Sequence, residues 1–328
     1  MKFVLTDVVG STAKNEQILK MLPDGAEVAC VYQDPDDTAS FLKEIESADA
    51  IINVYAKFGK EEIDHLKACK VISFRSTAFS SVDIDYAAEK GIAVCNVNEY
   101  CTQEVSDHAI MFMLALQKGL MYHEKSIQKD KEWKWNAAPG VRRIEGQTLG
   151  IFGLGKIGQA VARKAQALGM KVIAYDPYLP QSVAADMGVE LTLTDIDWVL
   201  ANSDVITIHM NLTSENSAFF DLSKFEKMIK NPFIINVARG PMIDEEDLAK
   251  ALDLGLVRGA GLDVLESENP GLTKCPLLGR PNVILTAHGA FFSHESVAAL
   301  GRVAAENAIA CLEGRYKDAG RVVNGVGL

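Results

Sequence analysis

The stretch TLGIFGLGKIGQAVARKAQALGMKVIAYDP (residues 148–177) combines an apolar run, a glycine-rich turn, a helical pattern and a second apolar run. The turn has the spacing Gly153-x-Gly155-x-x-Gly158. In a strand–turn–helix unit, the first glycine makes the tight turn, the second lets a phosphate approach the backbone, and the third lets helix and strand pack closely. Amide groups at the helix N-terminus then face the anion. The stretch therefore predicts a βαβ unit that binds a dinucleotide, the alternative being an ordinary glycine-containing turn.

The second apolar run of this stretch ends in Asp176. An acidic side chain at this point of a βαβ unit accepts hydrogen bonds from the adenosine ribose and repels a 2′-phosphate, which favours NAD over NADP. The alternative is a turn aspartate before Pro177. Lys156 and Ile157 stand inside the glycine motif, and we assign them to the same predicted cofactor site.

Short apolar runs alternate with helical patterns on both sides of this stretch. The runs expected to form strands are 2–7, 27–31, 50–54, 71–74, 93–95, 149–152, 171–175, 205–209, 233–237, 259–264 and 283–286. Long helices are expected at 102–122 and 293–313, whereas 125–147 has no regular pattern. This alternation is typical of parallel sheets, and 328 residues favour two domains. The predicted fold class is α/β, with two doubly wound parallel-sheet domains.

The composition argues against several classes of protein. The net charge is −11 and no run of lysines and arginines reaches about five residues, so nucleic acid is not an expected partner. The six cysteines form no CxxC pair, which indicates reduced thiols and no metal site. No apolar run approaches the roughly 18 residues of a membrane span, and the first residues do not resemble a signal peptide. We therefore expect a cytoplasmic protein without a membrane partner.

Three chemically complementary side chains follow predicted strands late in the chain. Arg239 follows FIINVA, Glu268 lies after GLDVL, and His288 follows VILTA. Ligands of open parallel sheets bind at the carboxyl ends of the strands. The arginine can hold both oxygens of a carboxylate, and the histidine can protonate an alkoxide that forms during hydride transfer. A glutamate beside the histidine would orient its ring and favour the charged form. The set predicts reduction of a 2-keto acid; the alternatives are a surface arginine, an acidic loop residue and a structural histidine.

Taken together, these residues resemble the D-isomer-specific 2-hydroxyacid dehydrogenases over nearly the whole chain. The matching segments are NVNEYCTQEVSDHA (96–109), GLGKIG (153–158), YDP (175–177), INVARGPMIDEEDL (235–248), GAGLDVLESENP (259–270) and NVILTAHGAFFS (282–293). The resemblance implies that Arg239 anchors the substrate, that Glu268 pairs with the acid/base histidine His288, and that Asp263 contacts the nicotinamide carboxamide.

The resemblance also implies a domain plan. Residues 1–98 plus 296–328 are expected to form a flavodoxin-like substrate-binding domain, into which a Rossmann NAD-binding domain, 99–295, is inserted. Members of the family are usually dimers joined through the cofactor domain. The long helix after Thr102 and the irregular segment that follows it suit such a contact, so a homodimer is expected.

Two branches of the family, the D-lactate-dehydrogenase-like and the C-terminal-binding-protein-like, have the most similar motifs. Their members surround the substrate with one loop and two aromatic residues. The corresponding positions here are Thr77, Ala78 and Phe79 of the loop, together with Tyr100 and Phe291. Ala78 replaces the glycine usual in that loop. An extra residue, Asn269, separates Glu268 from Pro270, so Glu266 is the alternative partner for the histidine.

The expected function is NAD-dependent hydride transfer between NADH and a small 2-keto acid, with pyruvate and D-lactate favoured because of the apolar residues at the expected pocket. Glyoxylate or hydroxypyruvate reduction is one alternative. A non-catalytic NADH-binding regulator, similar to the corepressors that share this fold, is the other.

Overall fold

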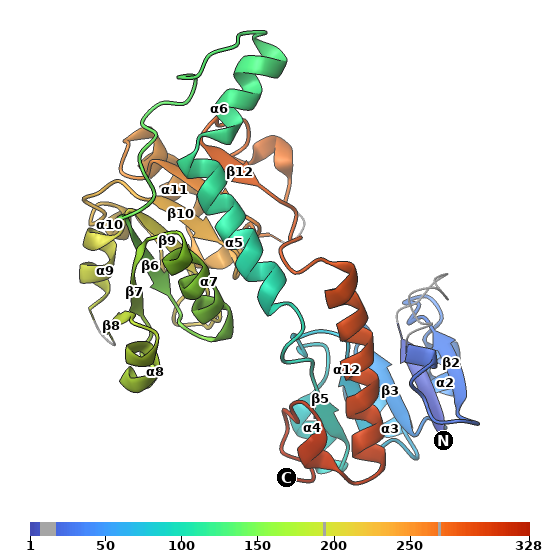
Figure 1. Cartoon of the computed structure of the whole chain (residues 1–328). Helices are drawn as coiled ribbons and strands as arrows, with labels where there is room; N and C mark the ends of the chain where they lie inside the picture. The colour runs from blue at the N-terminus through green and yellow to red at the C-terminus, as the bar shows by residue number, and fades with distance from the viewer. Residues whose placement is uncertain (7–17, 193–194, 268–269) are drawn as a thin grey trace. The chain divides into compact units, whose positions relative to one another are not determined.

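The computed structural model of the chain describes residues 1–6, 18–192, 195–267 and 270–328 (Figure 1). It divides into two compact units. Unit 1 consists of Met1–Tyr100 and Ser293–Leu328, and unit 2 consists of Cys101–Phe292. Unit 2 is therefore inserted in the sequence of unit 1. Each unit is built on one all-parallel sheet with helices, so the predicted α/β class with two parallel-sheet domains is confirmed.

Unit 1 has a five-stranded parallel sheet in the order β2-β1-β3-β4-β5, which is the flavodoxin-like order. Its strands are β1 (Lys2–Thr6), β2 (Glu27–Val31), β3 (Ala50–Asn53), β4 (Val71–Phe74) and β5 (Ala93–Cys95). Its helices are α2 (Thr38–Ile45), α3 (Lys60–His65), α4 (Ile84–Glu89) and α12 (His294–Leu312), with a 3₁₀ turn at Tyr316–Asp318.

The two faces of the sheet in unit 1 are covered by helices from different parts of the chain. Successive residues of a strand point to opposite faces. Val4 and Ile72 accordingly pack in the cluster formed with α2, α3 and α4, whereas Phe3, Leu5 and Val71 pack in the cluster formed with α12. Helix α12, near the C-terminus, thus packs in the same core as β1, near the N-terminus.

Unit 2 has a seven-stranded parallel sheet in the order β12-β11-β10-β9-β6-β7-β8. Its strands are β6 (Thr148–Phe152), β7 (Lys171–Tyr175), β8 (Glu190–Thr192), β9 (Val205–Ile208), β10 (Phe233–Asn236), β11 (Gly259–Leu262) and β12 (Val283–Leu285). Its helices are α5 (Thr102–Gln117), α6 (Leu120–Glu124), α7 (Lys156–Ala167), α8 (Gln181–Asp186), α9 (Ile196–Asn202), α10 (Leu222–Phe225) and α11 (Glu245–Asp253), with a π-helical turn at Lys125–Lys129 and 3₁₀ turns at Gly240–Met242 and Leu272–Lys274. The strand order reverses between β6 and β9, which is the position where open parallel sheets bind ligands.

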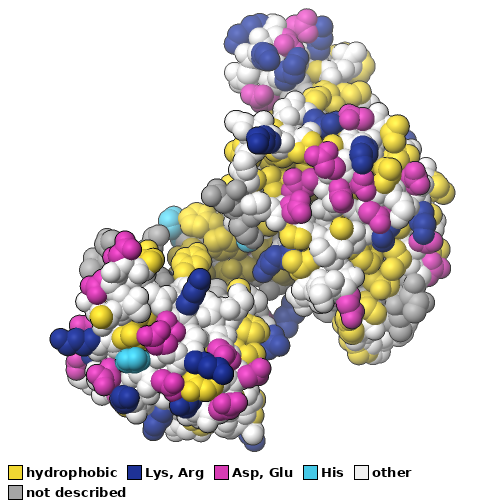
Figure 2. Space-filling model, turned by 180° about the vertical axis from the view of Figure 1, so that it is seen from behind, with side chains coloured by type: hydrophobic (Ala, Val, Ile, Leu, Met, Phe, Trp, Pro, Cys, Tyr) yellow, Lys and Arg dark blue, Asp and Glu magenta, His cyan; other side chains and the backbone are white. Residues whose placement is uncertain are grey.

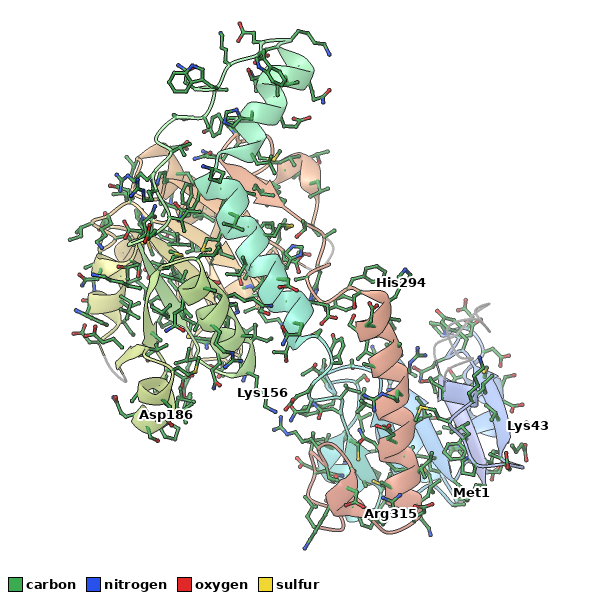
Figure 3. All side chains as sticks on the ribbon, in the orientation of Figure 1. Met1, Lys43, Lys156, Asp186, His294 and Arg315 are labelled. Carbon is green, nitrogen blue, oxygen red and sulfur yellow. The ribbon has the colours of Figure 1, made fainter. Side chains whose placement is uncertain are left out.

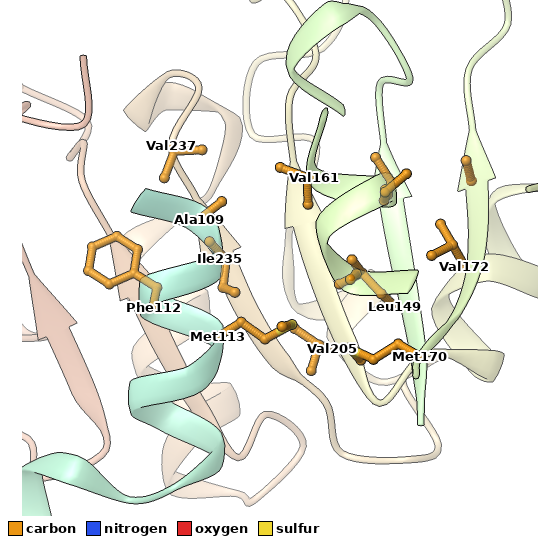
Figure 4. Packing of buried hydrophobic residues seen from close by; sticks show 14 of the residues in the cluster. Ala109, Phe112, Met113, Leu149, Val161, Met170, Val172, Val205, Ile235 and Val237 are labelled. Atoms are coloured by element: carbon orange, nitrogen blue, oxygen red, sulfur yellow. The ribbon is translucent and has the colours of Figure 1, made fainter. Parts of the chain in front are cut away.

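Helix α5 packs closely against the sheet of unit 2. Ala109 and Phe112 lie near Ile235 of β10 and Val237, which directly follows this strand (Figure 4). A Cβ atom on Gly261 of β11 would lie 2.7 Å from the ring of Phe112. The glycine in this strand therefore lets the helix approach, and it fixes α5 above β10 and β11.

Two features of unit 2 differ from the sequence-based expectations. The prediction of one helix over 102–122 is wrong, because Gly119 adopts the left-handed conformation (φ 62°) between α5 and α6. A glycine after the last helical turn ends a helix in this way. Strand β8 was not predicted, because three residues carry too little periodicity to indicate a strand. Asp7, at the end of the predicted strand 2–7, lies outside the described residues.

The segment that we call the arm (residues 118–147) extends from unit 2, with α6 at its start (Figure 1). Trp133 and Trp135 on the arm are each 91% exposed. Figure 2 shows lysine and arginine side chains gathered on this part of unit 2, at the top of the view. Among the described residues, no helix is long and apolar enough to cross a membrane, and no group of three or more potential metal ligands occurs.

Candidate active site

The glycine turn has the geometry that its spacing predicts. Gly153 has φ +92°, and a Cβ there would lie 2.7 Å from the backbone nitrogen of Met210. A Cβ on Gly158 would lie 2.3 Å from the carbonyl oxygen of Gly153, whereas a Cβ on Gly155 would meet nothing within 4 Å. Only glycine fits the first and third positions, and open space lies beside the second, at the N-terminus of α7. This arrangement fits a pyrophosphate group that approaches the backbone at Gly155.

Asp176 connects the end of β7 to the glycine turn. Its Oδ2 accepts a hydrogen bond from the backbone nitrogen of Leu154 (2.8 Å), and its Oδ1 accepts bonds from the backbone nitrogens of Tyr178 and Leu179 (2.9 and 3.2 Å). The turn role considered from the sequence is therefore present. The carboxylate also lies directly at the glycine turn, where a ribose role requires it to be.

The other two residues of the motif differ in exposure. Ile157 is partly buried and packs against the core shared with α5. Lys156 is exposed and extends from the start of α7 (Figure 3).

Arg239 lies at the carboxyl end of β10 on a tightly held turn. Asn236, which is 1% exposed, donates through Nδ2 to the carbonyl of Arg239 (2.9 Å) and accepts through Oδ1 from the backbone nitrogen of Ala238 (3.0 Å). A Cβ on Gly240 would lie 1.7 Å from the carbonyl oxygen of Leu265. The turn is therefore fixed against the segment that follows β11, while the Arg239 side chain itself is exposed.

His288 lies beyond the carboxyl end of β12 and has an unusual backbone. Its φ is +49°, a conformation that is uncommon for residues other than glycine. Its backbone nitrogen donates to the carbonyl oxygen of Asp263 (2.7 Å). The exposed ring meets that of Phe291 edge-on, with centroids 6.3 Å apart. The structure therefore brings together two of the predicted site residues, His288 and Phe291, and supports their turn with a third, Asp263.

The predicted partner of this histidine, Glu268, lies outside the described residues. The alternative, Glu266, is exposed, and its backbone nitrogen donates to Oε1 of Glu245 (2.5 Å). The backbone at Glu266 is thus attached to the start of α11.

In unit 1, the loop after β4 contains the remaining predicted pocket residues. Ser76 Oγ donates to the carbonyl of Ala78 (2.6 Å), and Asn96 Nδ2 donates to the carbonyl of Thr77 (2.7 Å). Within the described part of the chain, no hydrogen bond uses the backbone nitrogens of Thr77, Ala78 or Phe79. The loop therefore has its carbonyl groups bonded and its amides available. Tyr100 is partly buried and is the last residue of Met1–Tyr100, the first of the two segments that form unit 1.

Several polar residues of the site were not found from the sequence. Asn236 and Thr286 each close an apolar strand run, and this pattern could have singled them out. His209, whose backbone lies beside Gly153, follows β9 in the same way; burial lowers the pKa of His209 to about 3, so its ring is neutral. His108, on α5, had no local signal.

Comparison with known proteins shows the family to which the chain belongs. The model of a family described as "D-isomer specific 2-hydroxyacid dehydrogenase, NAD binding domain" matches residues 110–290, which is more than half of the chain. The chain belongs to this dehydrogenase family. The resemblance predicted from the motifs is therefore confirmed, and the domain that contains the glycine turn is the family's NAD-binding domain.

Curated relatives of the chain include two D-3-phosphoglycerate dehydrogenases. The D-3-phosphoglycerate dehydrogenase of Methanocaldococcus jannaschii is 34% identical over 325 residues, which cover 99% of this chain and 59% of the relative. The chain spans between half and three fifths of the length of the curated relatives it matches.

Two solved structures of the family's fold match over both units. The D-lactate dehydrogenase of Aquifex aeolicus, complexed with NAD and lactic acid, has a TM-score of 0.81 at 26% identity, over 98% of this chain and 99% of that one. A glyoxylate reductase from Paecilomyes thermophila has a TM-score of 0.80 at 26% identity, over 95% of each chain.

Proposed function

We propose that the protein is an NAD-dependent 2-hydroxyacid dehydrogenase that reduces a small 2-keto acid. One observation carries the proposal. The glycine turn follows β6, Arg239 follows β10 and His288 follows β12 of a single parallel sheet. Because parallel strands have their carboxyl ends at the same edge, the nucleotide turn, an arginine and a histidine share one edge of unit 2.

The proposed mechanism gives each residue a separate task. NADH, when bound, would supply the hydride for the carbonyl carbon. Arg239 holds the substrate carboxylate through its two parallel N–H groups and draws electron density from the adjacent carbonyl. His288 donates a proton to the carbonyl oxygen as negative charge develops there. Glu268 is assigned to hold the histidine ring, and the amides of Thr77, Ala78 and Phe79 are assigned to the substrate carboxylate.

The same proposal includes the cofactor contacts that the sequence predicts. The backbone at Gly155 and the start of α7, including Lys156 and Ile157, receive the phosphates. The carboxylate of Asp176 is assigned to accept hydrogen bonds from the ribose hydroxyls. The carboxylate of Asp263 is assigned to contact the nicotinamide carboxamide. Among the described residues, Oδ2 of Asp263 accepts one hydrogen bond, from the backbone nitrogen of Ala290, and a carboxylate oxygen has capacity for a second.

For the substrate, we favour a keto acid with a small uncharged side chain, of the pyruvate type. The residues assigned to its pocket, Phe79, Tyr100 and Phe291, are aromatic and carry no cation that would neutralise a phosphate. Glyoxylate or hydroxypyruvate is the second candidate, since a glyoxylate reductase has the same fold over 95% of the chain. The curated relatives named as phosphoglycerate dehydrogenases make a phosphorylated keto acid the necessary comparison.

A single assay tests the proposal. Oxidation of NADH is followed at 340 nm with pyruvate, glyoxylate, hydroxypyruvate and 3-phosphohydroxypyruvate, each over a range of concentrations. We expect the highest kcat/KM with pyruvate. A preference for the phosphorylated acid would reject the proposed substrate class but not the reaction. NADH binding without turnover of any acid would instead favour a regulatory, non-catalytic role.

We further propose that the protein is a homodimer joined through unit 2. The arm exposes Trp133 and Trp135, and large apolar side chains at a surface are typical of interfaces. A cavity of about 210 Å³ lies between Tyr122 and Pro139 of the arm and Phe233 of β10. Trp135→Ala is expected to raise the dimer dissociation constant in sedimentation experiments, and an unchanged constant would exclude this part of the arm from the interface.

We also propose a cytoplasmic location. The six free cysteines favour a reducing compartment.

A further inference from the structure

His108 on α5 is connected to the turn of His288 by a short series of hydrogen bonds. Nε2 of His108 lies 2.9 Å from Oγ1 of Thr286, and Oγ1 of Thr286 donates to Oδ1 of Asp263 (2.5 Å). The side chain of His108 is 17% exposed and that of Asp263 is 1% exposed. All of these residues belong to unit 2, and they lie on α5, after β11 and after β12.

The donors and acceptors in this series can have only one direction. An ionised Asp263 is an acceptor only, so it takes the one hydroxyl proton of Thr286. The hydroxyl oxygen of Thr286 must then accept from His108, whose Nε2 has to carry hydrogen. Burial lowers the pKa of His108, while Asp263 raises it less, so the ring is neutral with its hydrogen on Nε2. His108 therefore fixes the Thr286 hydroxyl in the orientation that bonds to Asp263.

Asp263 in turn holds the turn that carries His288. Its Oδ1 accepts from the backbone nitrogen of Gly289 (2.9 Å), its Oδ2 accepts from that of Ala290 (2.9 Å), and its carbonyl accepts from that of His288 (2.7 Å). Three consecutive amides thus depend on one buried residue. Because His288 has φ +49°, the turn needs these bonds to remain in an unfavourable conformation.

The ring of His108 is itself held on α5. It meets the ring of Phe112 edge-on, with centroids 4.6 Å apart, and Phe112 is fully buried against the sheet. The carboxylate of Asp263, 3.7 Å from Nε2, is the charged group that faces the ring in the described residues. The orientation of the Nε2–H group is therefore set by the packing of the helix.

We propose that His108 is a positioning residue that holds the His288 turn through Thr286 and Asp263. The inference rests on the proposed role of His288 in proton donation, and it adds a residue on a helix that precedes the glycine turn in the sequence. His108 makes no contact with substrate in this proposal. It acts by keeping the acid at the geometry that hydride transfer requires.

Two variants at one position test the donor role. His108→Phe keeps an aromatic ring beside Phe112 but removes the N–H group, whereas His108→Gln places an amide donor near the original Nε2. We expect His108→Phe to lower kcat about tenfold, the scale of one hydrogen bond to a charged network, with the Kd for NADH unchanged. His108→Gln should recover most of that loss. Thr286→Val should resemble His108→Phe, and the two changes together should cost little more than either alone.

A second measurement does not depend on activity. Hydrogen–deuterium exchange of the peptide that covers residues 283–292 should be faster in His108→Phe than in the parent, and close to the parent in His108→Gln. Equal kcat and equal exchange in His108→Phe and the parent would overturn the inference. Equal losses in His108→Phe and His108→Gln would also overturn it, because the donor would then be irrelevant. If the parent reduces no keto acid, the proposed function fails, and the exchange rates alone decide whether His108 holds the turn.

Discussion

Units 1 and 2 have the same parallel α/β architecture but offer different chemical groups at their strand ends. In unit 2, Arg239 and His288 present side chains, and the buried side chains of Asn236 and Asp263 hold their turns. In unit 1, the loop after β4 presents backbone amides. Residue types point to groups of the first kind in a sequence. Every residue except proline has a backbone amide, so the loop of unit 1 was assigned from the family resemblance alone, and its hydrogen bonds add which amides have no partner among the described residues.

Replacement of His288 is the strongest test of the side-chain site. His288→Asn is chosen because asparagine tolerates a positive φ, so the turn is preserved while the acid is lost. We expect kcat for keto-acid reduction to fall by roughly 10³-fold, within the range of general acid catalysis. NADH binding, measured by fluorescence titration, should remain near that of the parent. Turnover within tenfold of the parent would remove His288 from the mechanism.

Arg239→Lys sharpens the same comparison, since it keeps the charge and removes the planar pair of donors. The expected loss in kcat/KM is about 10²-fold. Arg302→Lys on α12, where the arginine pairs with Glu306 on the surface, is the matched control and should have parental kinetics. Similar kinetics for both variants would mean that Arg239 does not hold the substrate.

The glutamate assignment is tested by a pair of variants. Reduction consumes a proton, and a carboxylate beside His288 favours its charged form, so loss of that carboxylate should move the alkaline fall in rate toward lower pH. Glu268→Gln is expected to lower the rate about tenfold on the alkaline side of the profile, the effect of one lost charge interaction. Glu266→Gln is the control. If only Glu266→Gln moves the profile, the partner of the histidine is Glu266.

The backbone site of unit 1 can be tested by the removal of one amide. Ala78→Pro deletes the N–H group of residue 78, and kcat/KM is expected to fall about fivefold to tenfold, mainly through KM. Ala78→Gly retains the amide and should remain within about twofold of the parent. The thermal unfolding temperatures of both variants show whether they remain folded. Parental KM in a folded Ala78→Pro protein would show that the amides do not bind substrate.

The smallest effect is expected for cofactor choice. The parent should prefer NADH over NADPH by at least about tenfold in kcat/KM, equivalent to about 1.4 kcal/mol. Asp176→Asn keeps one acceptor oxygen, which can serve the amides of Tyr178 and Leu179, but it loses the acceptor for the amide of Leu154 and the charge that repels a 2′-phosphate. The preference should fall several-fold. Equal use of both cofactors by the parent would contradict the assignment of Asp176.

The sequence predicted the strands and the glycine turn well because both depend on local patterns. The run at 171–175 is largely buried, and close backbone contacts at Gly153 and Gly158 leave few residue types permitted there. The break at Gly119 was missed because the apolar pattern continues past it, although a Cβ there would lie 2.2 Å from Cβ of Ala138.

The supporting residues of the site could not be predicted for a different reason. His108 and Thr286 are 178 positions apart, and their hydrogen bond exists only because α5 crosses the sheet beside β11 and β12. No local pattern contains that information. Asp263 was assigned from the family motif to a cofactor contact, while its bonds to Gly289 and Ala290 were not foreseen.

The insertion of unit 2 within unit 1 has a consequence for synthesis on the ribosome. Strands β1 to β5 emerge first, but α12, which covers Phe3, Leu5 and Val71, emerges only after the whole of unit 2. At about 5–20 residues per second, the roughly 200 intervening residues take on the order of 10–40 s. During that interval one face of the first sheet is without its covering helix, while unit 2 is already able to fold. The nascent chain therefore offers chaperones an apolar surface on the sheet of unit 1, and translation speed sets how long that surface persists.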